Sequence, residues 1–225
     1  MATPLLLPRG EKTKGQEVPL WGDLGGAILP CCYLAPVSHY RAYYRADEVQ
    51  IEVCDHFAKQ TLRNRCWIDS PNGPLALTVP VVKTEGKTLM REIRISDHGN
   101  WRHQHWMALE SSYRQSPFFE YYADDFAPFY EKKWEFLADY NEELMMLVAS
   151  LLDIEKTVKR TTEPPQPSIK GSELLTTKSS PFKGKLEGDF GLPYYQVFAS
   201  RHGFLQDLSI VDLLFNMGPE GVLWL

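Results

Sequence analysis

Long hydrophobic runs are missing from this sequence. No stretch approaches the roughly 20 apolar residues that span a bilayer. Leu5-Leu6-Leu7 is much shorter than the apolar core of a signal peptide, which has about 7–15 residues. We therefore expect a cytoplasmic protein without membrane insertion.

Cysteine is scarce, and its spacing excludes two classes of protein. The chain has four cysteines, at Cys31, Cys32, Cys54 and Cys66, and no CxxC pair. This spacing supports neither a zinc cage nor the disulfide framework of a secreted domain. We expect buried or partly exposed thiols in a reducing compartment.

An excess of basic residues is also absent. The 225 residues include 24 Lys and Arg against 29 Asp and Glu, a net charge of −5, which argues against a nucleic-acid partner. A chain of this length, with 44% hydrophobic residues, can bury a core without metals or disulfides. Residues 1–25 show no periodicity and predict a loose leader, so we expect a single domain over 26–225.

The apolar patterns predict an α/β fold. An N-terminal strand–helix–strand sheet, parallel with a right-handed crossover, is followed by a β-hairpin around Asn72-Gly73, a pair typical of a tight reversal. Packed C-terminal helices come after it. The expected strands are 27–29, 49–53, 65–68, 75–79 and 91–95, and the first helix is about 37–46.

The helical half carries a long apolar stripe. It predicts one helix over about 128–154, capped by Asp124 or Asp125, with Pro128 in its first turn. Asn141 interrupts the stripe and should have a defined partner, because an unpaired buried amide costs about 1–3 kcal/mol. The other expected features are helices at 101–113 and 210–215, the latter stopped by Gly218-Pro219, and a mobile excursion at about 155–191.

Several separated motifs occur in a fixed order. The N-terminal ones are AILP at 27–30 with Tyr33-Leu34, Asp55, Arg63-Asn64-Arg65, and Asn72-Gly73 leading into LTVPV at 77–81. The helical ones are Trp101, His105, Tyr113, Pro117-Phe118 and Asn141, and the closing ones are 208–216 and Gly218-Pro219-Glu220. In this combination the chain resembles the WbqC-like family of bacterial surface-polysaccharide gene clusters.

The resemblance implies a role in the biosynthesis of O-antigen and related surface glycans. A glycine or aminoacyl transferase activity is what it implies for the chemistry. The first loop departs from the family pattern, because Cys31-Cys32 and Ser38-His39 stand where the family has a polar or small pair and an aromatic-Gly step.

Polar residues follow the first two expected strands. Open α/β sheets bind ligands outside the carboxyl ends of their strands, so Tyr33, His39, Tyr40 and Asp55 are expected to converge there. Asp55 either bonds a ribose or sugar hydroxyl, holds a metal-bound phosphate or orients a histidine, or it caps a helix or turn. Three cations and an amide come next, and they form either a phosphate-binding group or a solvated loop. They are Lys59, Arg63, Asn64 and Arg65.

His105 is the candidate general base in the helical half. It lies one turn from Trp101 and Leu109, on a half-apolar face where a histidine serves either as a base or as a buried structural residue. His98 and His103 do not complete a metal site with it, because residues two apart on a helix point in different directions. The further candidates for substrate binding are Trp101, Tyr113, Asn141, Gln196, Asp212 and Asn216.

Three functional hypotheses follow. The first is a transferase acting on an activated-sugar or acyl donor, with His105 or His39 as base, Asp55 as orienter and Arg63 and Arg65 as anion holders. The second is a nucleotidylyltransferase-like enzyme, suggested by the first loop and His39, although the second histidine and the glycine of that signature are missing. The third is a non-catalytic scaffold whose 155–191 segment orders on a glycan-synthesis partner. No cofactor follows from the sequence.

Overall fold

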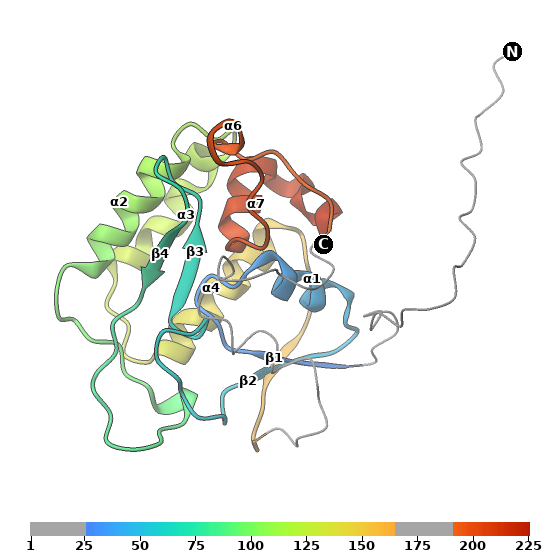
Figure 1. Ribbon diagram of the computed structural model, residues 1–225. Helices are drawn as coiled ribbons and strands as arrows, with labels where there is room; N and C mark the ends of the chain where they lie inside the picture. The colour runs from blue at the N-terminus through green and yellow to red at the C-terminus, as the bar shows by residue number, and fades with distance from the viewer. Residues whose placement is uncertain (1–25, 165–190) are drawn as a thin grey trace, which may run out of the picture.

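The computed structural model of the protein describes residues 26–164 and 191–225. Figure 1 shows a small sheet at one end, a β-hairpin beside it and a layer of helices packed on both. The predicted α/β class is confirmed. The expected leader over 1–25 and residues 165–190 of the expected excursion lie outside the described residues.

The N-terminal sheet is parallel, as the sequence predicts. Strands β1 (Ala27–Pro30) and β2 (Val49–Glu52) pair in register through Leu29 and Ile51, and α1 (Val37–Arg45) connects them. The strand order is β1-β2-β5, with β5 spanning Val158–Arg160. The predicted excursion is therefore wrong at its beginning, because 158–160 pair with β2.

The β-hairpin is confirmed. β3 (Arg65–Ile68) and β4 (Leu75–Thr78) pair antiparallel, and Gly73 in the connection has a φ of 99°, a conformation that glycine adopts without strain.

The strand predicted at 91–95 is wrong. Residues Met90–Glu92 form a 3-10 turn, η1, and the chain beyond it makes only isolated bridges from Arg94 to Phe136 and from Ile95 to Val81. The alternation arises because Ile93 and Ile95 are buried while the intervening residue is not.

The single helix predicted over 128–154 is also wrong. The structure has α3 (Phe119–Glu131) and α4 (Leu137–Leu151), separated by an extended turn after Glu131. Pro128 lies inside α3 rather than in a first turn, and Asp124 and Asp125 are interior residues rather than caps. One stripe continues through both helices because both bury it in the same core.

The remaining helices assemble around α7 (Ile210–Met217), which ends at Gly218 as predicted. Its residues from Ile210 to Phe215 are fully buried, and it contacts α1, α2 (Trp101–Tyr113), α3 and α4. Two short elements flank it, α6 (Ala199–His202) and the 3-10 helix η2 (Gly218–Trp224). In Figure 1, α2 and α3 lie beside the hairpin, and α7 lies between them and α1. None of the helices in 26–164 or 191–225 is both long and apolar enough to cross a membrane.

Candidate active site

A buried tyrosine connects the loop after β1 to the helices. The backbone N–H of Tyr33 donates to the carbonyl of Leu62 at 2.9 Å. This hydrogen bond fixes the loop after β1 to the segment just before β3. The Tyr33 side chain is fully buried. Its hydroxyl lies 2.9 Å from Nδ1 of His105 and 3.1 Å from the hydroxyl of Tyr130. Residues from the first loop, α2 and α3 therefore meet in one hydrogen-bonded chain.

The environment of His105 keeps its imidazole neutral. The residue is 5% exposed, and the ring of Trp101, one turn earlier on α2, packs edge-on against it with centroids 5.1 Å apart. Burial lowers the pKa of His105 to about 4, although a backbone hydrogen bond to Thr78 opposes this. At neutral pH the ring is uncharged and can accept a proton.

The direction of each hydrogen bond in the chain follows from the donors available. A neutral imidazole carries one hydrogen, and we assign it to Nε2, on the side of Thr78, so that Nδ1 accepts from the Tyr33 hydroxyl. Tyr33 has then used its only hydrogen, so its oxygen accepts from Tyr130. Tyr130 in turn donates to Tyr33 and keeps an oxygen lone pair for another donor.

Tyr140, on α4, completes the aromatic surroundings. Its ring stacks on that of Tyr33 with centroids 5.7 Å apart. Burial raises the pKa of Tyr33, Tyr130 and Tyr140, so all three stay protonated and available as hydrogen-bond donors. The Tyr140 hydroxyl neighbours those of Tyr33 and Tyr130, but no contact has hydrogen-bonding geometry.

Tyr130 also lines a surface pocket. The pocket has a volume of about 340 Å³ and lies between the first turn of α2 and the last turns of α3. It falls within the range of roughly 300–1,000 Å³ that is usual for small-molecule sites. The residues that line it are Gly99, Asn100, Arg102, His103, Trp106, Ala127, Tyr130 and Glu131.

The charge of Arg102 in this pocket is shared with its neighbours. Its guanidinium lies over the ring of Trp101 at 4.7 Å, and its Nη2 is 2.7 Å from Oδ1 of Asp97. The ammonium of Lys133 is 3.0 Å from the other carboxylate oxygen of Asp97. Hydrogen bonds from Lys133 and Arg102 lower the pKa of Asp97. These three side chains together carry one net positive charge beside the pocket.

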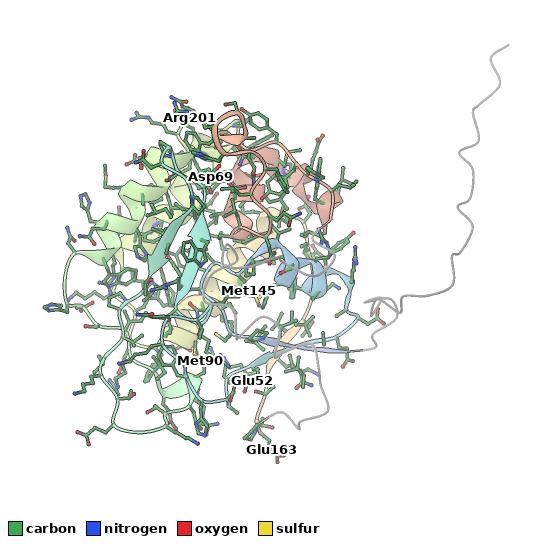
Figure 2. The ribbon with its side chains drawn as sticks, in the orientation of Figure 1. Glu52, Asp69, Met90, Met145, Glu163 and Arg201 are labelled. Atoms are coloured by element: carbon green, nitrogen blue, oxygen red, sulfur yellow. The ribbon has the colours of Figure 1, made fainter. Side chains whose placement is uncertain are left out.

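A second cluster lies at the carboxyl ends of the parallel strands. Asp55 is joined to Arg63 by a 2.5 Å ion pair in which the arginine side chain is 4% exposed. Glu52 accepts the backbone N–H groups of Cys54 and Asp55, each at 2.6 Å. Burial raises the pKa of Glu52. Figure 2 shows Glu52 at the sheet, at the opposite end of the molecule from Asp69.

The structure does not bring the predicted phosphate-binding cations together. Arg63 is engaged by Asp55, Arg65 donates to the Thr78 hydroxyl at 2.8 Å, and Lys59 is exposed. Asn64 donates to the Val79 carbonyl at 3.0 Å and so fixes the hairpin. This stretch therefore organises the backbone around β3.

His39 and Tyr40 lie on α1, and their rings pack against each other. The Nε2 of His39 is 3.0 Å from the carbonyl of Pro30, at the end of β1. Burial lowers the pKa of His39 to about 4. Tyr40 is 1% exposed and packs beside the ring of His39. His39 therefore joins α1 to the end of β1, and the side chains of Tyr33, His39 and Asp55 each have a different hydrogen-bond partner.

Asn141 has the defined partner that its position predicts. Its side-chain N–H donates to the backbone carbonyl of Arg63 at 2.8 Å, which ties α4 to the segment before β3.

A third cluster surrounds Asp212 on α7. Its carboxylate accepts the hydroxyls of Tyr113 at 2.8 Å and Tyr194 at 2.7 Å, and the side-chain N–H of Gln196 at 2.9 Å. Burial raises the pKa of Asp212 to about 6, against these three hydrogen bonds. Asn216 donates to the Asp212 backbone carbonyl at 2.7 Å. The cluster is fully enclosed and joins α2, α7 and 191–198.

Asp69 extends this third cluster to the hairpin turn. Its backbone N–H donates to the Tyr113 hydroxyl at 3.2 Å, and its carboxylate lies 3.9 Å from Nε2 of His202. Burial raises the pKa of Asp69. Figure 2 places Asp69 near Arg201, at the top of the hairpin. Sequence reasoning missed Asp69, Tyr194 and His202.

The pH dependence of stability gives a prediction for the buried histidines. The folded-state pKa of His39, about 4, lies below its ordinary value of 6.5, so the unfolded chain binds more protons between these values. Stability should fall as the pH drops from 6.5 to 4, by about 3 kcal/mol for this residue. The variant H39Q keeps a hydrogen-bond donor for the Pro30 carbonyl but has no titrating ring. The contribution of His39 to the fall in stability between pH 6.5 and 4 should therefore be absent from it. Urea unfolding at several pH values measures it, and an equal slope in both proteins would contradict the prediction.

Metal-binding side chains do not gather within 26–164 or 191–225: no group of three His, Cys, Asp or Glu there could hold an ion. All four cysteines are free and buried.

Comparison with known proteins gives a family. An uncharacterized protein of Mycobacterium tuberculosis (strain ATCC 25618 / H37Rv), Rv1507c, is 32% identical over 130 residues. The match covers 57% of this chain and 56% of that protein, so the chain spans little more than half the length of this relative. No solved structure matches. The model of the WbqC-like protein family matches residues 32–180, a range that contains Tyr33, His105 and Tyr130, and the chain therefore belongs to the WbqC-like protein family.

Proposed function

We propose that this protein is a cytoplasmic transferase of bacterial surface-polysaccharide biosynthesis. It moves an acyl, aminoacyl or sugar group from an activated donor to a small-molecule acceptor held in the pocket between α2 and α3. One observation carries the proposal: a buried neutral histidine is connected through Tyr33 to Tyr130, which lines that pocket.

The connected side chains provide a route for the acceptor's proton. When the acceptor oxygen or nitrogen attacks the donor, its bond to the transferred group forms and the bond to the leaving group breaks. The acceptor's proton passes to Tyr130, whose own proton passes to Tyr33, and that of Tyr33 passes to Nδ1 of His105. The proton then returns by the same route to the leaving group. Positioned proton transfer of this kind contributes about 10²–10⁴-fold to a rate.

The role of each predicted residue changes accordingly. His105 is the base, and Tyr130 and Tyr33 pass the acceptor's proton to it. Asp55 and Arg63 hold the carboxyl end of the sheet through their ion pair, while His39 supports α1 through the Pro30 carbonyl.

The proposal is tested by a search for turnover. The full-length protein is incubated with acyl thioesters, aminoacyl donors and nucleotide sugars, each with neutral and amino sugars as acceptors, and products are identified by mass spectrometry. A product whose formation needs His105 supports a transferase. The absence of any product, or equal product with H105F, would contradict it.

A further inference from the structure

We propose that the pocket between α2 and α3 binds a small zwitterion, with its ammonium group at Glu131 and its anionic group at the start of α2. The phosphate ester of an amino sugar is the ligand class that fits. This inference rests on the proposed function in taking that ligand as the acceptor of the transfer.

The α3 side of the pocket has a carboxylate that is unpaired within the described part of the chain. Glu131 is the last residue of α3, and it has no ion pair or hydrogen bond within 26–164 and 191–225. An anionic side chain at a helix C-terminus is disfavoured, because the helix dipole is negative there. The carboxylate and the dipole therefore act in the same direction and attract a cation. A ligand ammonium would relieve this unfavourable charge placement.

The α2 side of the pocket is positive. Asn100 begins the helix without a side-chain hydrogen bond to the first turn, so the first N–H groups point to the outside of the helix with a partial positive charge. Arg102, Lys133 and Asp97 add one net positive charge. Helix N-termini bind phosphate through these N–H groups, and an anionic group of the ligand would occupy this side.

The wall between these two sides is aromatic. The rings of Trp106 and Tyr130 have centroids 5.7 Å apart, and both residues line the pocket. Aromatic faces attract cations and also pack against the apolar face of a sugar ring. Tyr130 is 6% exposed, and its oxygen has a free lone pair because its hydrogen is donated to Tyr33.

The size of the pocket distinguishes two classes of zwitterionic ligand, a small amino acid and an amino-sugar phosphate. Its volume of about 340 Å³ lies within the range of roughly 300–1,000 Å³ that is usual for sites of drug-sized molecules. A single small amino acid such as glycine would leave most of this space unfilled, whereas a hexosamine phosphate would fill it.

Calorimetric titration of the full-length protein tests the inference with four probes. Glucosamine 6-phosphate carries both charges, glucosamine only the positive one, glucose 6-phosphate only the negative one, and glycine is the small zwitterion. Glucosamine 6-phosphate should bind at least tenfold more tightly than each of the other three, as expected for the loss of one charged hydrogen bond.

The variant E131Q identifies the ammonium site. It should weaken binding of glucosamine 6-phosphate about tenfold and leave that of glucose 6-phosphate unchanged. E120Q, at the other end of the same helix and also exposed, is the matched control and should bind like the wild type. The inference is overturned if no probe binds, if glucose 6-phosphate or glycine binds as tightly as the zwitterionic sugar, or if E131Q equals E120Q.

These results separate the inference from the proposed function. Selective binding of glucosamine 6-phosphate without turnover would support the ligand class and count against the transferase. Turnover of another acceptor that is unaffected by E131Q would support the transferase and overturn the ligand class.

Discussion

Replacing Tyr130 by Phe is expected to reduce the rate of transfer by about 10²–10⁴-fold. The variant keeps the ring, which packs against Trp106, and removes only the hydroxyl that joins the pocket to Tyr33. The acceptor's proton then has no route to His105. The rate is measured with the donor and acceptor found in the search for products, at saturating concentrations of both.

A control on the same helix separates the loss of the Tyr130 hydroxyl from any effect that a Tyr-to-Phe change elsewhere on α3 would have on the rate. Tyr121 is 77% exposed, and Y121F should retain the wild-type rate. Circular dichroism and urea unfolding should show that Y130F folds. A rate for Y130F within about twofold of the wild type would contradict the relay, since a general base contributes far more than that.

Replacing Asp212 by Ala is expected to lower the free energy of unfolding by about 3–5 kcal/mol. The change leaves the hydroxyls of Tyr113 and Tyr194 and the Gln196 amide without their shared acceptor, in a part of the molecule that water does not reach. The melting temperature should fall by roughly 6–20 °C for a chain of this length. Urea unfolding followed by tryptophan fluorescence measures the loss.

Two further variants establish the cause. D212N should be intermediate, because its oxygen still accepts on one side while its NH2 group faces donors on the other. D124A changes an exposed aspartate on α3 and should stay within about 0.5 kcal/mol of the wild type. A loss below about 1 kcal/mol for D212A would mean that this cluster does not stabilise the fold.

Local patterns predicted β1, β2 and the hairpin because their signals are short in range, but β5 was missed. The alternation in 49–53 and the turn residues Asn72-Gly73 each depend on a few neighbouring residues, and β2 and the hairpin follow them. The strand predicted at 91–95 failed because alternation reports which side chains are buried. Ile93 ends the turn η1 and Ile95 lies in an isolated bridge, yet both are buried as they would be in a ladder.

The break between α3 and α4 could not be read from the apolar stripe. Both helices bury that stripe in one core, so the periodicity continues across the turn after Glu131. The prediction of one continuous helix also concealed the pocket. Tyr130 and Glu131 line the pocket at the C-terminal end of α3, and that end exists only because the helix stops at Glu131. A tyrosine in an apolar stripe is nevertheless a usable signal, since its buried hydroxyl needs a partner.

The candidate site was predicted in separate parts. Tyr33 and His105 were both named from the sequence, and His105 was expected near the strand ends only if the helices fold back over the sheet, because 72 residues separate the two. Their contact depends on how α2 packs against the first loop, which no local pattern encodes. Asp55 and Arg63 were correctly associated, yet as ligand-binding groups, whereas the structure pairs them with each other.

The hydrogen-bonded chain from the pocket to the buried histidine is tested most directly by ¹⁵N NMR of the His105 ring. The ring should be neutral, with its hydrogen on Nε2 and Nδ1 accepting from Tyr33, and should titrate near pH 4 rather than 6.5. Y33F should shift the Nδ1 resonance as that hydrogen bond is lost, and Y130F should shift it by a smaller amount. A hydrogen on Nδ1, or an Nδ1 resonance that neither variant moves, would contradict the account.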